Sequence, residues 1–381
     1  MSEQTFVLAP DSFKESMTAK QVCVAMERGL RNVFPQGNYI HVPMADGGEG
    51  TVQSLVDASG GTMMQLEVSG PLGEPVLASY GILGDGQTAA IEMASASGLH
   101  LVPRQQRNPL ITSTYGTGQL ILACLEQGIR KIIIGIGGSA TNDGGAGMAE
   151  ALGVRLLDEQ GEVLPRGGAA LAQLSRIDCS GLDQRLQQTE LIVACDVSNP
   201  LCGEQGASHV FGPQKGATPE MVRQLDDSLH HYADVIMRDL NKDVRELPGA
   251  GAAGGLGAGL MTFTQATLQR GIDIVIQYTG LREQLEGADL VFTGEGGIDF
   301  QTKFGKTPHG VAQAAKAAGK PVIAIAGYVG EGIDTLYEEG IDAIFGIVPG
   351  AGELEQLLEQ GPANVERTME NIGRTLKLSL G

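Results

Sequence analysis

The fold is most constrained by the stretch Lys131-Ile-Ile-Ile-Gly-Ile-Gly-Gly-Ser-Ala-Thr-Asn-Asp-Gly-Gly-Ala-Gly-Met148. Its opening residues, Lys131–Ile134, predict a short buried strand. Glycine then fills six of the fourteen positions from Gly135 to Met148, which excludes an ordinary helix or strand. The hydrogen-bonding side chains in this loop are those of Ser139, Thr141, Asn142 and Asp143. Bare backbone beside hydroxyls and a carboxylate is typical of a site for an anionic ligand and its metal ion.

Composition excludes several classes of function. The chain has 381 residues, a net charge of −19, 4% aromatic residues and no Trp. The negative charge argues against binding of nucleic acid or an anionic membrane, and no apolar run is long enough to span a bilayer. The five cysteines form no CxxC pair and the N-terminus lacks a basic region, so we expect a cytoplasmic protein. Monomer and homodimer both remain open.

The two ends of the chain show the same alternation of strand and helix. Near the N-terminus, the pattern Thr18-Ala-Lys-Gln21 resembles a capping box and predicts a helix that runs to about Phe34. We therefore predict an α/β fold with a discontinuous, Rossmann-like parallel-sheet domain formed by residues 1–65 and 288–381. Its expected strands are Phe6–Ala9, Tyr39–Pro43, Ala288–Phe292, Pro321–Ala326 and Ala343–Val348, and its further helices Gly50–Ser59, Pro308–Ala318, Ile333–Glu339 and a pair within Glu353–Leu378.

The middle of the chain has a different pattern. Three strand-like runs between Gln65 and Met93 are separated by glycine turns, which predicts an antiparallel meander. Helices are expected near Gln119–Gln127 and Pro219–Asp243. We predict that residues 66–287 form an inserted, mixed α/β domain, with the active site in the cleft between the two domains.

Acidic loops follow several of the predicted strands, at the ends where open α/β sheets bind ligands. The loops carry Asp11, Asp46 with Glu49, Asp143, Asp196, and Glu295 with Asp299. A single aspartate after a strand is most often a turn residue or a helix cap, but five such loops together favour a functional site.

Glycine and lysine loops supply candidates for phosphate binding. The run Gly249–Gly259 contains Gly254, Gly255 and Gly257, whose backbone could approach a phosphate or, equally, pack against another backbone. Lys14, Lys215 and Lys306 lie in comparable loops. Lysines that hold phosphates beside carboxylates that hold Mg²⁺ or orient a hydroxyl are the elements of phosphoryl transfer.

Other chemistries have weaker support. Gly135–Ala140 fits the dinucleotide pattern G-x-G-x-x-A with Asp158 near the expected distance, but Thr141–Gly145 separates it from any helix. An NAD-dependent oxidoreductase acting on a hydroxy acid is therefore a less favoured alternative. His230 lies within a polar predicted helix and is interpreted as a surface residue. Cys202 is interpreted as a small buried residue because nothing nearby would activate its thiol. The other histidines lack a metal-ligand spacing such as H-x-x-x-H.

The acidic, glycine and lysine loops, taken in their order along the chain, closely resemble those of the bacterial glycerate kinase family, of the glycerate 2-kinase type. The matching stretches run from residue 9 to about 300, most of the chain. They are Ala9–Ser16, Ala45–Thr51, Ile91–Gly98, Thr114–Gly118, Gly137–Gly147, Ala194–Val197, Phe211–Ala217, Gly249–Gly257 and Thr293–Gly296. One position departs: the family usually has Arg where this chain has Gly297. That departure keeps open a non-catalytic sensor of a nucleotide or sugar acid.

The resemblance implies ATP-dependent phosphorylation of D-glycerate with Mg²⁺, most often at O2 to give 2-phosphoglycerate, with 3-phosphoglycerate as the alternative product. Within that frame we assign roles by the chemistry of each side chain. Catalytic candidates are Asp196 as first choice for the base, Asp143, Asp299 and Lys14, with Asp143 and Asp299 also candidates for Mg²⁺. Glycerate is assigned to Asp11, Ser12, Asp46 and Glu49, and ATP to Gly137, Gly138, Ser139, Thr141, Asn142, Lys215, Gly254, Gly255, Gly257, Glu295 and Lys306.

Overall fold

The computed structural model describes residues 4–379, which form two compact units. The end unit comprises residues 4–46, 53–60 and 271–379, and the middle unit comprises residues 47–52 and 61–270. Residues 1–3 lie outside the described residues. They belong to the N-terminal stretch on which the expectation of a cytoplasmic protein partly rests. None of the helices within 4–379 combines the length and apolar character that crossing a membrane requires.

The end unit contains a five-stranded, wholly parallel sheet in the order β13-β12-β11-β1-β2. This confirms the predicted parallel sheet drawn from both ends of the chain. Its strands are β1 (Thr5–Leu8), β2 (Asn38–His41), β11 (Leu290–Ile298), β12 (Val322–Val329) and β13 (Ala343–Gly346). Its helices are α1 (Ala19–Arg31), most of α2 (Thr51–Ser59), α9 (Gly271–Tyr278), α10 (Leu281–Leu285), α11 (Thr307–Ala317), α12 (Asp334–Glu338), α13 (Leu354–Glu359) and α14 (Gly361–Ser379).

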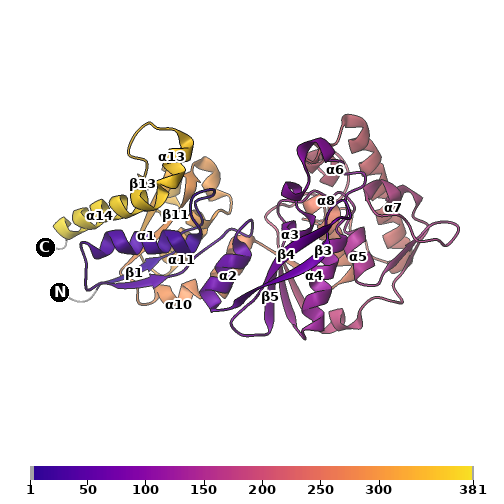
Figure 1. Cartoon of the computed structure of the whole chain (residues 1–381), viewed down its shortest axis with the longest axis horizontal. Helices are drawn as coiled ribbons and strands as arrows, with labels where there is room; N and C mark the ends of the chain where they lie inside the picture. Colours follow the sequence, from indigo (N-terminus) through magenta and orange to yellow (C-terminus); the bar gives the residue numbers. More distant parts are fainter. Residues whose placement is uncertain (1–3, 380–381) are drawn as a thin grey trace. The chain divides into compact units, whose positions relative to one another are not determined.

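The first and last long helices of the end unit pack side by side, as Figure 1 shows for α1 and α14. Helix α1 begins with the predicted capping box, in which Thr18 and Gln21 satisfy each other's backbone N–H groups. At Gly29 the helices approach so closely that a Cβ would lie 2.2 Å from the Glu366 carbonyl oxygen. Apolar residues of both helices, including Met26 and Met369, cover the sheet residues Phe6 and Phe292.

Strands β1 and β11 lie next to each other, although some 280 residues separate them in sequence. The chain continues from β1 to β2 on one side, and from β11 to β12 and β13 on the other. The loops that follow β1 and β11 therefore diverge, which makes this carboxyl edge the usual ligand position in an open α/β sheet.

Strand β11 corrects one prediction. The segment Thr293–Ile298 was expected to be a loop, but it continues β11 and pairs with β12, with Glu295 opposite Ala326 and Gly297 opposite Tyr328. The small residues of this segment allow the close pairing: a Cβ on Gly294 would lie 2.3 Å from the Ile325 carbonyl oxygen. Glycine here marks close contact between backbones, not a turn.

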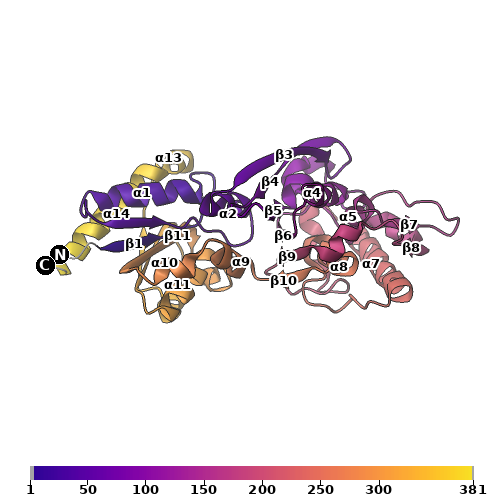
Figure 2. The same ribbon diagram turned by 90° about the horizontal axis from the view of Figure 1, so that it is seen from below.

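The middle unit contains a six-stranded mixed sheet in the order β10-β9-β6-β5-β4-β3, seen in Figure 2. Strands β3, β4 and β5 pair antiparallel, as predicted, and β5, β6, β9 and β10 are parallel. Its strands are β3 (Thr62–Ser69), β4 (Pro75–Ile82), β5 (Thr88–Glu92), β6 (Lys131–Gly135), β9 (Glu190–Ala194) and β10 (Thr267–Gln269), with β7 (Arg155–Leu157) and β8 (Arg176–Asp178) in a separate pair. Its helices are α3 (Ala94–Ser97), α4 (Tyr115–Glu126), α5 (Ala146–Ala151), α6 (Ala207–Phe211), α7 (Pro219–Leu240) and α8 (Ala252–Phe263).

Helix α8 contains a left-handed turn at Ala253, Gly254 and Gly255, where all three φ angles are positive. This turn packs directly on the backbone of the glycine-rich loop after β6. The Gly254 carbonyl accepts a hydrogen bond from the Gly144 N–H at 3.0 Å, and a Cβ on Gly254 would lie 2.0 Å from the Thr141 carbonyl oxygen. Of the two interpretations of this glycine run, packing against another backbone is the one that the structure shows directly.

We expect Gly254→Ala to destabilise the middle unit more than Gly161→Ala does. Both glycines have positive φ, but a Cβ at Gly161 meets no atom within 4 Å. The control should cost about 1–2 kcal/mol for the left-handed conformation alone, and Gly254→Ala at least about 2 kcal/mol more because the backbones must separate. Denaturant unfolding measures both, and equal losses would contradict the packing argument.

Candidate functional site

Three carboxylates gather at the carboxyl edge of the end unit's sheet, where β1, β11 and β2 end. Asp11 follows β1, Glu295 lies near the end of β11, and Asp46 follows β2. The chain after β2 stays beside the chain after β1, since Val42 N–H donates to the Leu8 carbonyl and Met44 N–H to the Pro10 carbonyl. Asp46 is thereby close enough to act electrostatically on both other carboxylates.

Asp11 is a buried carboxylate with fixed orientation. One of its oxygens accepts the Ser12 N–H at 2.6 Å, and the other accepts the Thr307 hydroxyl at the start of α11. Burial raises the pKa of Asp11 to about 6, the negative charge of Asp46 adds to the increase, and the hydrogen bonds oppose it. The sequence predicted that Asp11 belongs to the site but not that it would be desolvated.

Glu295 is the second desolvated carboxylate of the cluster. Its Oε1 accepts the Thr302 hydroxyl at 3.1 Å, and the Lys306 ammonium lies 3.8 Å from its Oε2. Burial raises the pKa of Glu295 to about 7, with further increases from Asp11 and Asp46, while Lys306 lowers it. Carboxylates with strongly perturbed pKa values at a sheet's switch point are typical of functional sites.

The remaining predicted residues of the end unit differ in their surroundings. Lys14 is exposed, and Ser12 is half-buried next to Asp11. Asp299 is half-buried and caps the short helical turn Phe300–Lys303, accepting the Gln301 N–H at 2.8 Å. One oxygen of the Asp299 carboxylate is therefore used as a helix cap.

In the middle unit, the loop after β6 exposes its glycines and buries its polar side chains. Gly137 and Gly138 are exposed, whereas Ser139, Thr141 and Asn142 are buried. The Asn142 amide donates to the Ser208 hydroxyl at 2.9 Å, and the Thr141 N–H donates to the Ser139 hydroxyl at 3.0 Å. These side chains hold the loop in shape, and the backbone at Gly137 and Gly138 is the part that faces outward.

Lys215 lies beneath this loop and is only 2% exposed. Its ammonium donates to the Thr141 carbonyl at 2.6 Å and to the Ser139 hydroxyl at 3.2 Å. Burial lowers the pKa of Lys215 to about 7, and the charge of Asp143 partly offsets that decrease. Lys215 thus contacts the glycine loop, and its ammonium supports the loop from within.

Asp143 is completely buried, with 0% exposure. Its Oδ2 accepts the Thr114 N–H at 2.8 Å, the Thr114 hydroxyl at 2.9 Å and the Gly147 N–H at 3.2 Å, while Oδ1 accepts the Gly145 N–H at 3.1 Å. Burial raises the pKa of Asp143, and these hydrogen bonds oppose the increase. In this conformation the carboxylate joins the beginnings of α4 and α5 and has no surface for a substrate.

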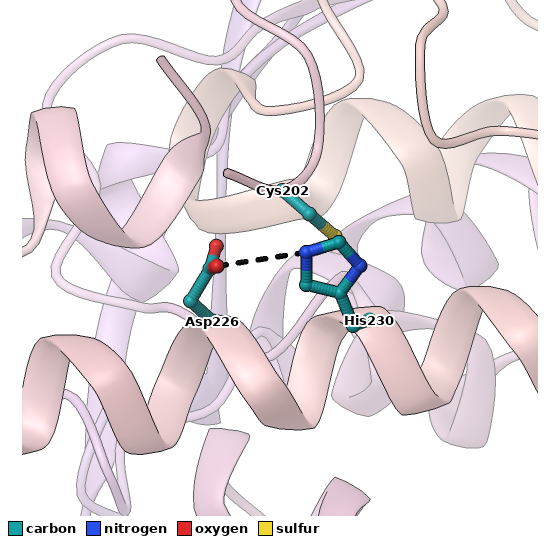
Figure 3. Close-up of side chains that lie close together, drawn as sticks. All are labelled: Cys202, Asp226 and His230. Atoms are coloured by element: carbon teal, nitrogen blue, oxygen red, sulfur yellow. Dashed lines mark ion pairs between the residues drawn. The ribbon is translucent and has the colours of Figure 1, made fainter. Parts of the chain in front are cut away.

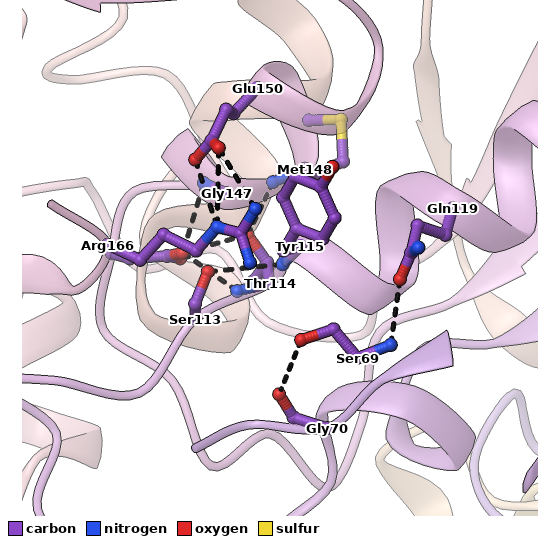
Figure 4. A network of polar contacts seen from close by, with 11 residues as sticks. Ser69, Gly70, Ser113, Thr114, Tyr115, Gln119, Gly147, Met148, Glu150 and Arg166 are labelled. Carbon is purple, nitrogen blue, oxygen red and sulfur yellow. Dashed lines mark hydrogen bonds and ion pairs between the residues drawn. The ribbon is translucent and has the colours of Figure 1, made fainter. Parts of the chain in front are cut away.

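Figure 4 shows the polar network that surrounds these two helix starts. The Thr114 hydroxyl accepts the Met148 N–H at 2.9 Å. Arg166 pairs with Glu150 at 3.0 Å, and its guanidinium lies over the Tyr115 ring, 3.3 Å from the centroid. These contacts join the starts of α4 and α5 next to the loop that carries Asp143.

The last predicted residues of the middle unit lie in two different segments. Asp196 is exposed directly after β9, and Glu49 is exposed in the segment that precedes α2.

Sequence reasoning missed Glu92, which ends β5 and accepts the Val52 N–H at 3.1 Å at the start of α2. It also missed Thr302 and Thr307. The position of Thr307, directly after Lys306 in the lysine loop, was the one signal in the sequence that could have marked it as a candidate.

Comparison with known proteins shows the family to which the chain belongs. The sequence profile described as "Glycerate kinase family" matches residues 6–377. The chain belongs to the glycerate kinase family. It is 58% identical over 97% of both chains to the glycerate kinase of Halalkalibacterium halodurans, and 52% identical over 98% of both to the glycerate 2-kinase of Escherichia coli K12. A crystal structure from Salmonella typhimurium LT2, provisionally named glycerate kinase 2, covers 100% of both chains at 52% identity, with a TM-score of 0.92.

Family membership confirms the resemblance drawn from the loops. Gly297 is the position at which the sequence is expected to depart from that family. Gly297 lies within β11, and a Cβ there would meet the Tyr328 ring at 3.9 Å, an ordinary contact. The strand therefore has room for a Cβ atom at this position.

We expect Glu295→Gln to stabilise the protein at alkaline pH. The pKa of Glu295 is about 7 in the folded protein and 4.5 in the unfolded chain. The folded protein therefore loses stability as the pH rises through that interval, because the unfolded chain releases the proton first. The variant should be about 1–2 kcal/mol more stable than the parent near pH 8.5, with the difference disappearing near pH 4.

Denaturant unfolding at both pH values measures this effect. Glu286→Gln, at an exposed position of the same unit, is the matched control and should change stability by less than about 0.5 kcal/mol at either pH. A Glu295→Gln effect that does not depend on pH would contradict the assignment of a desolvated carboxylate.

Proposed function

We propose that this protein transfers the γ-phosphoryl group of ATP to D-glycerate, at O2, to give 2-phosphoglycerate and ADP. The observation that carries the proposal is the family match over residues 6–377. Identity to a relative named glycerate 2-kinase, 52% over 98% of both chains, favours O2 over O3. The clustered carboxylates and the exposed glycine backbone are the groups that phosphoryl transfer requires.

The carboxylate cluster fits Mg²⁺ better than Asp143 does. Asp11, Asp46 and Glu295 repel one another in a partly desolvated setting, and Mg²⁺ prefers such oxygen ligands. Both oxygens of Asp143 already accept hydrogen bonds, which a metal would have to displace. Mg²⁺ held by the three clustered carboxylates would neutralise phosphate charge. We therefore propose the cluster for Mg²⁺, with Asp299 as the further candidate, and a positioning role for Asp143.

The phosphates of ATP are assigned to the loop after β6. Gly137 and Gly138 present backbone to solvent, and the buried ammonium of Lys215 lies under the same loop. Gly254 and Gly255 allow the close packing that keeps the loop in place, Gly257 packs on the Gly249 backbone, and Lys306 adds positive charge beside Glu295. The loop is supported from inside by the side chains of Ser139, Thr141 and Asn142. Its backbone is therefore the part proposed to contact ATP.

Glycerate is assigned to the segment after β1 and to neighbouring groups. Its carboxylate requires a cation, and exposed Lys14 can supply one next to Ser12 and Asp11. Glu49 and Asp46 remain candidates for its hydroxyls. A carboxylate as the base accepts the proton of the attacking hydroxyl while the new O–P bond forms and the bond to the ADP oxygen breaks. Asp196 is proposed as that base because it is exposed at the end of β9.

The first test is a set of parallel assays on the full chain. We expect ADP release with D-glycerate and ATP, little with L-glycerate or hydroxypyruvate, and no glycerate-dependent change in NAD(P)H absorbance. Phosphorus NMR of the product should show 2-phosphoglycerate. Formation of 3-phosphoglycerate would move the reaction to O3, NAD(P)H turnover would favour the oxidoreductase, and ligand binding without turnover would indicate a sensor.

The second test addresses the base. Asp196→Asn should lower kcat by about two to four orders of magnitude while ATP affinity stays largely unchanged, the usual range for loss of a general base. Ser198→Ala, at a nearby exposed position in the same loop, is the control and should keep near-parental turnover. Near-normal kcat in Asp196→Asn would remove this residue from the proposed role.

A further inference from the structure

Three side chains of metal-binding type point toward one another on the middle unit, as Figure 3 shows. Cys202 lies in the loop before α6, whereas Asp226 and His230 are one turn apart on α7. One potential ligand atom of each lies within 4.8 Å of the other two. Cys202 and Asp226 are buried, and His230 is exposed, so the group is accessible from solvent.

A further histidine lies beside this group, next to Asp226. His209 on α6 has its Nε2 atom 3.8 Å from Asp226 Oδ2, and the Nε2 atom of His230 is 3.6 Å from the same oxygen. Ligand atoms of a tetrahedral Zn²⁺ site are about 3.3–3.8 Å apart, given metal–ligand distances of about 2.0–2.3 Å. The two histidine–Asp226 distances are therefore near coordination spacing, and the Cys202 sulfur lies within 4.8 Å of the ligand atoms of Asp226 and His230.

The scaffold around these residues fixes their orientation. Asp226 Oδ1 accepts the Gly203 N–H at 2.9 Å, which leaves Oδ2 directed at the two histidines. The turn Cys202–Gly206 is tight, since the Gly206 N–H donates to the Gly203 carbonyl and a Cβ on Gly206 would lie 2.4 Å from the Cys202 carbonyl carbon. A carboxylate held by a second partner in this way is typical of metal sites.

The charges that act on the Cys202 sulfur favour a cation. Asp226, Glu246 and Asp234 contribute negative charge, against the positive charge of Arg245. Arg245 is itself paired with Asp234 at 2.9 Å. The net charge of these side chains is negative, which favours a bound cation, and Zn²⁺ would displace the proton of the Cys202 thiol on binding.

We propose that Cys202, Asp226 and His230 bind one Zn²⁺ ion, with His209 available as the fourth ligand. A thiolate and imidazoles select Zn²⁺ over Mg²⁺, which takes oxygen ligands, so this site is chemically distinct from the carboxylate cluster of the end unit. Because the ligands come from α6, α7 and the loop before α6, the ion joins these segments. The proposal does not depend on the substrate of the kinase.

The test uses the full chain freed of metal with a chelator and titrated with Co²⁺ as a spectroscopic substitute for Zn²⁺. We expect one equivalent of Co²⁺ with a thiolate charge-transfer band, displaced by stoichiometric Zn²⁺ and unaffected by excess Mg²⁺. Calorimetry with Zn²⁺ alone gives the affinity. Absence of the band, or Zn²⁺ binding weaker than millimolar in the parent, would overturn the proposal.

Two variants and two controls make the test specific. Cys202→Ser should abolish the band, and His230→Ala should weaken Zn²⁺ binding by more than the roughly 10- to 100-fold typical of lost second-shell partners. Cys179→Ser and His100→Ala, in the same unit and outside the cluster, should bind as the parent does. Circular dichroism confirms folding, and His230→Ala, changed at an exposed position, keeps the test valid if Cys202→Ser does not fold. Retention of parental binding in His230→Ala would contradict the site.

Discussion

The middle unit depends on one contact in which two backbones touch with no side chain between them. The left-handed turn at Ala253–Gly255 packs on residues 141–144, and Gly259 packs on Gly144 and Gly145 from the next turn of the helix. This contact fixes the loop after β6, which in turn keeps Gly137 and Gly138 exposed over buried Lys215. Glycine is abundant here because only a chain without Cβ atoms allows the approach.

The end unit places a different constraint on its site. Asp11 and Glu295 are desolvated at the edge of the sheet, close to the charge of Asp46. Such an arrangement destabilises the folded chain by itself and becomes favourable when a cation joins it. The two units thus supply complementary chemistry: one offers negative oxygen ligands, and the other offers backbone and a buried ammonium.

Local patterns predicted most of the secondary structure. The capping box at Thr18 and the glycine turns between β3, β4 and β5 act over a few residues, so the sequence shows them directly. The extension of β11 through Glu295 depends on pairing with β12, which no local pattern contains. The positions of Asp11 and Glu295 after predicted strands marked them as candidates in the sequence, but the burial of Asp143 and the proximity of Cys202 to α7 arise only in three dimensions.

The position of β1 has a consequence for synthesis of the chain. This strand lies between β2 and β11, yet β11 leaves the ribosome only after all of residues 61–270 have been made. The middle unit is thus complete while β1, with its buried Phe6 and Leu8, still lacks one neighbour. The protein is a case in which the first strand translated is among the last to be fully paired, so its apolar residues need protection during elongation.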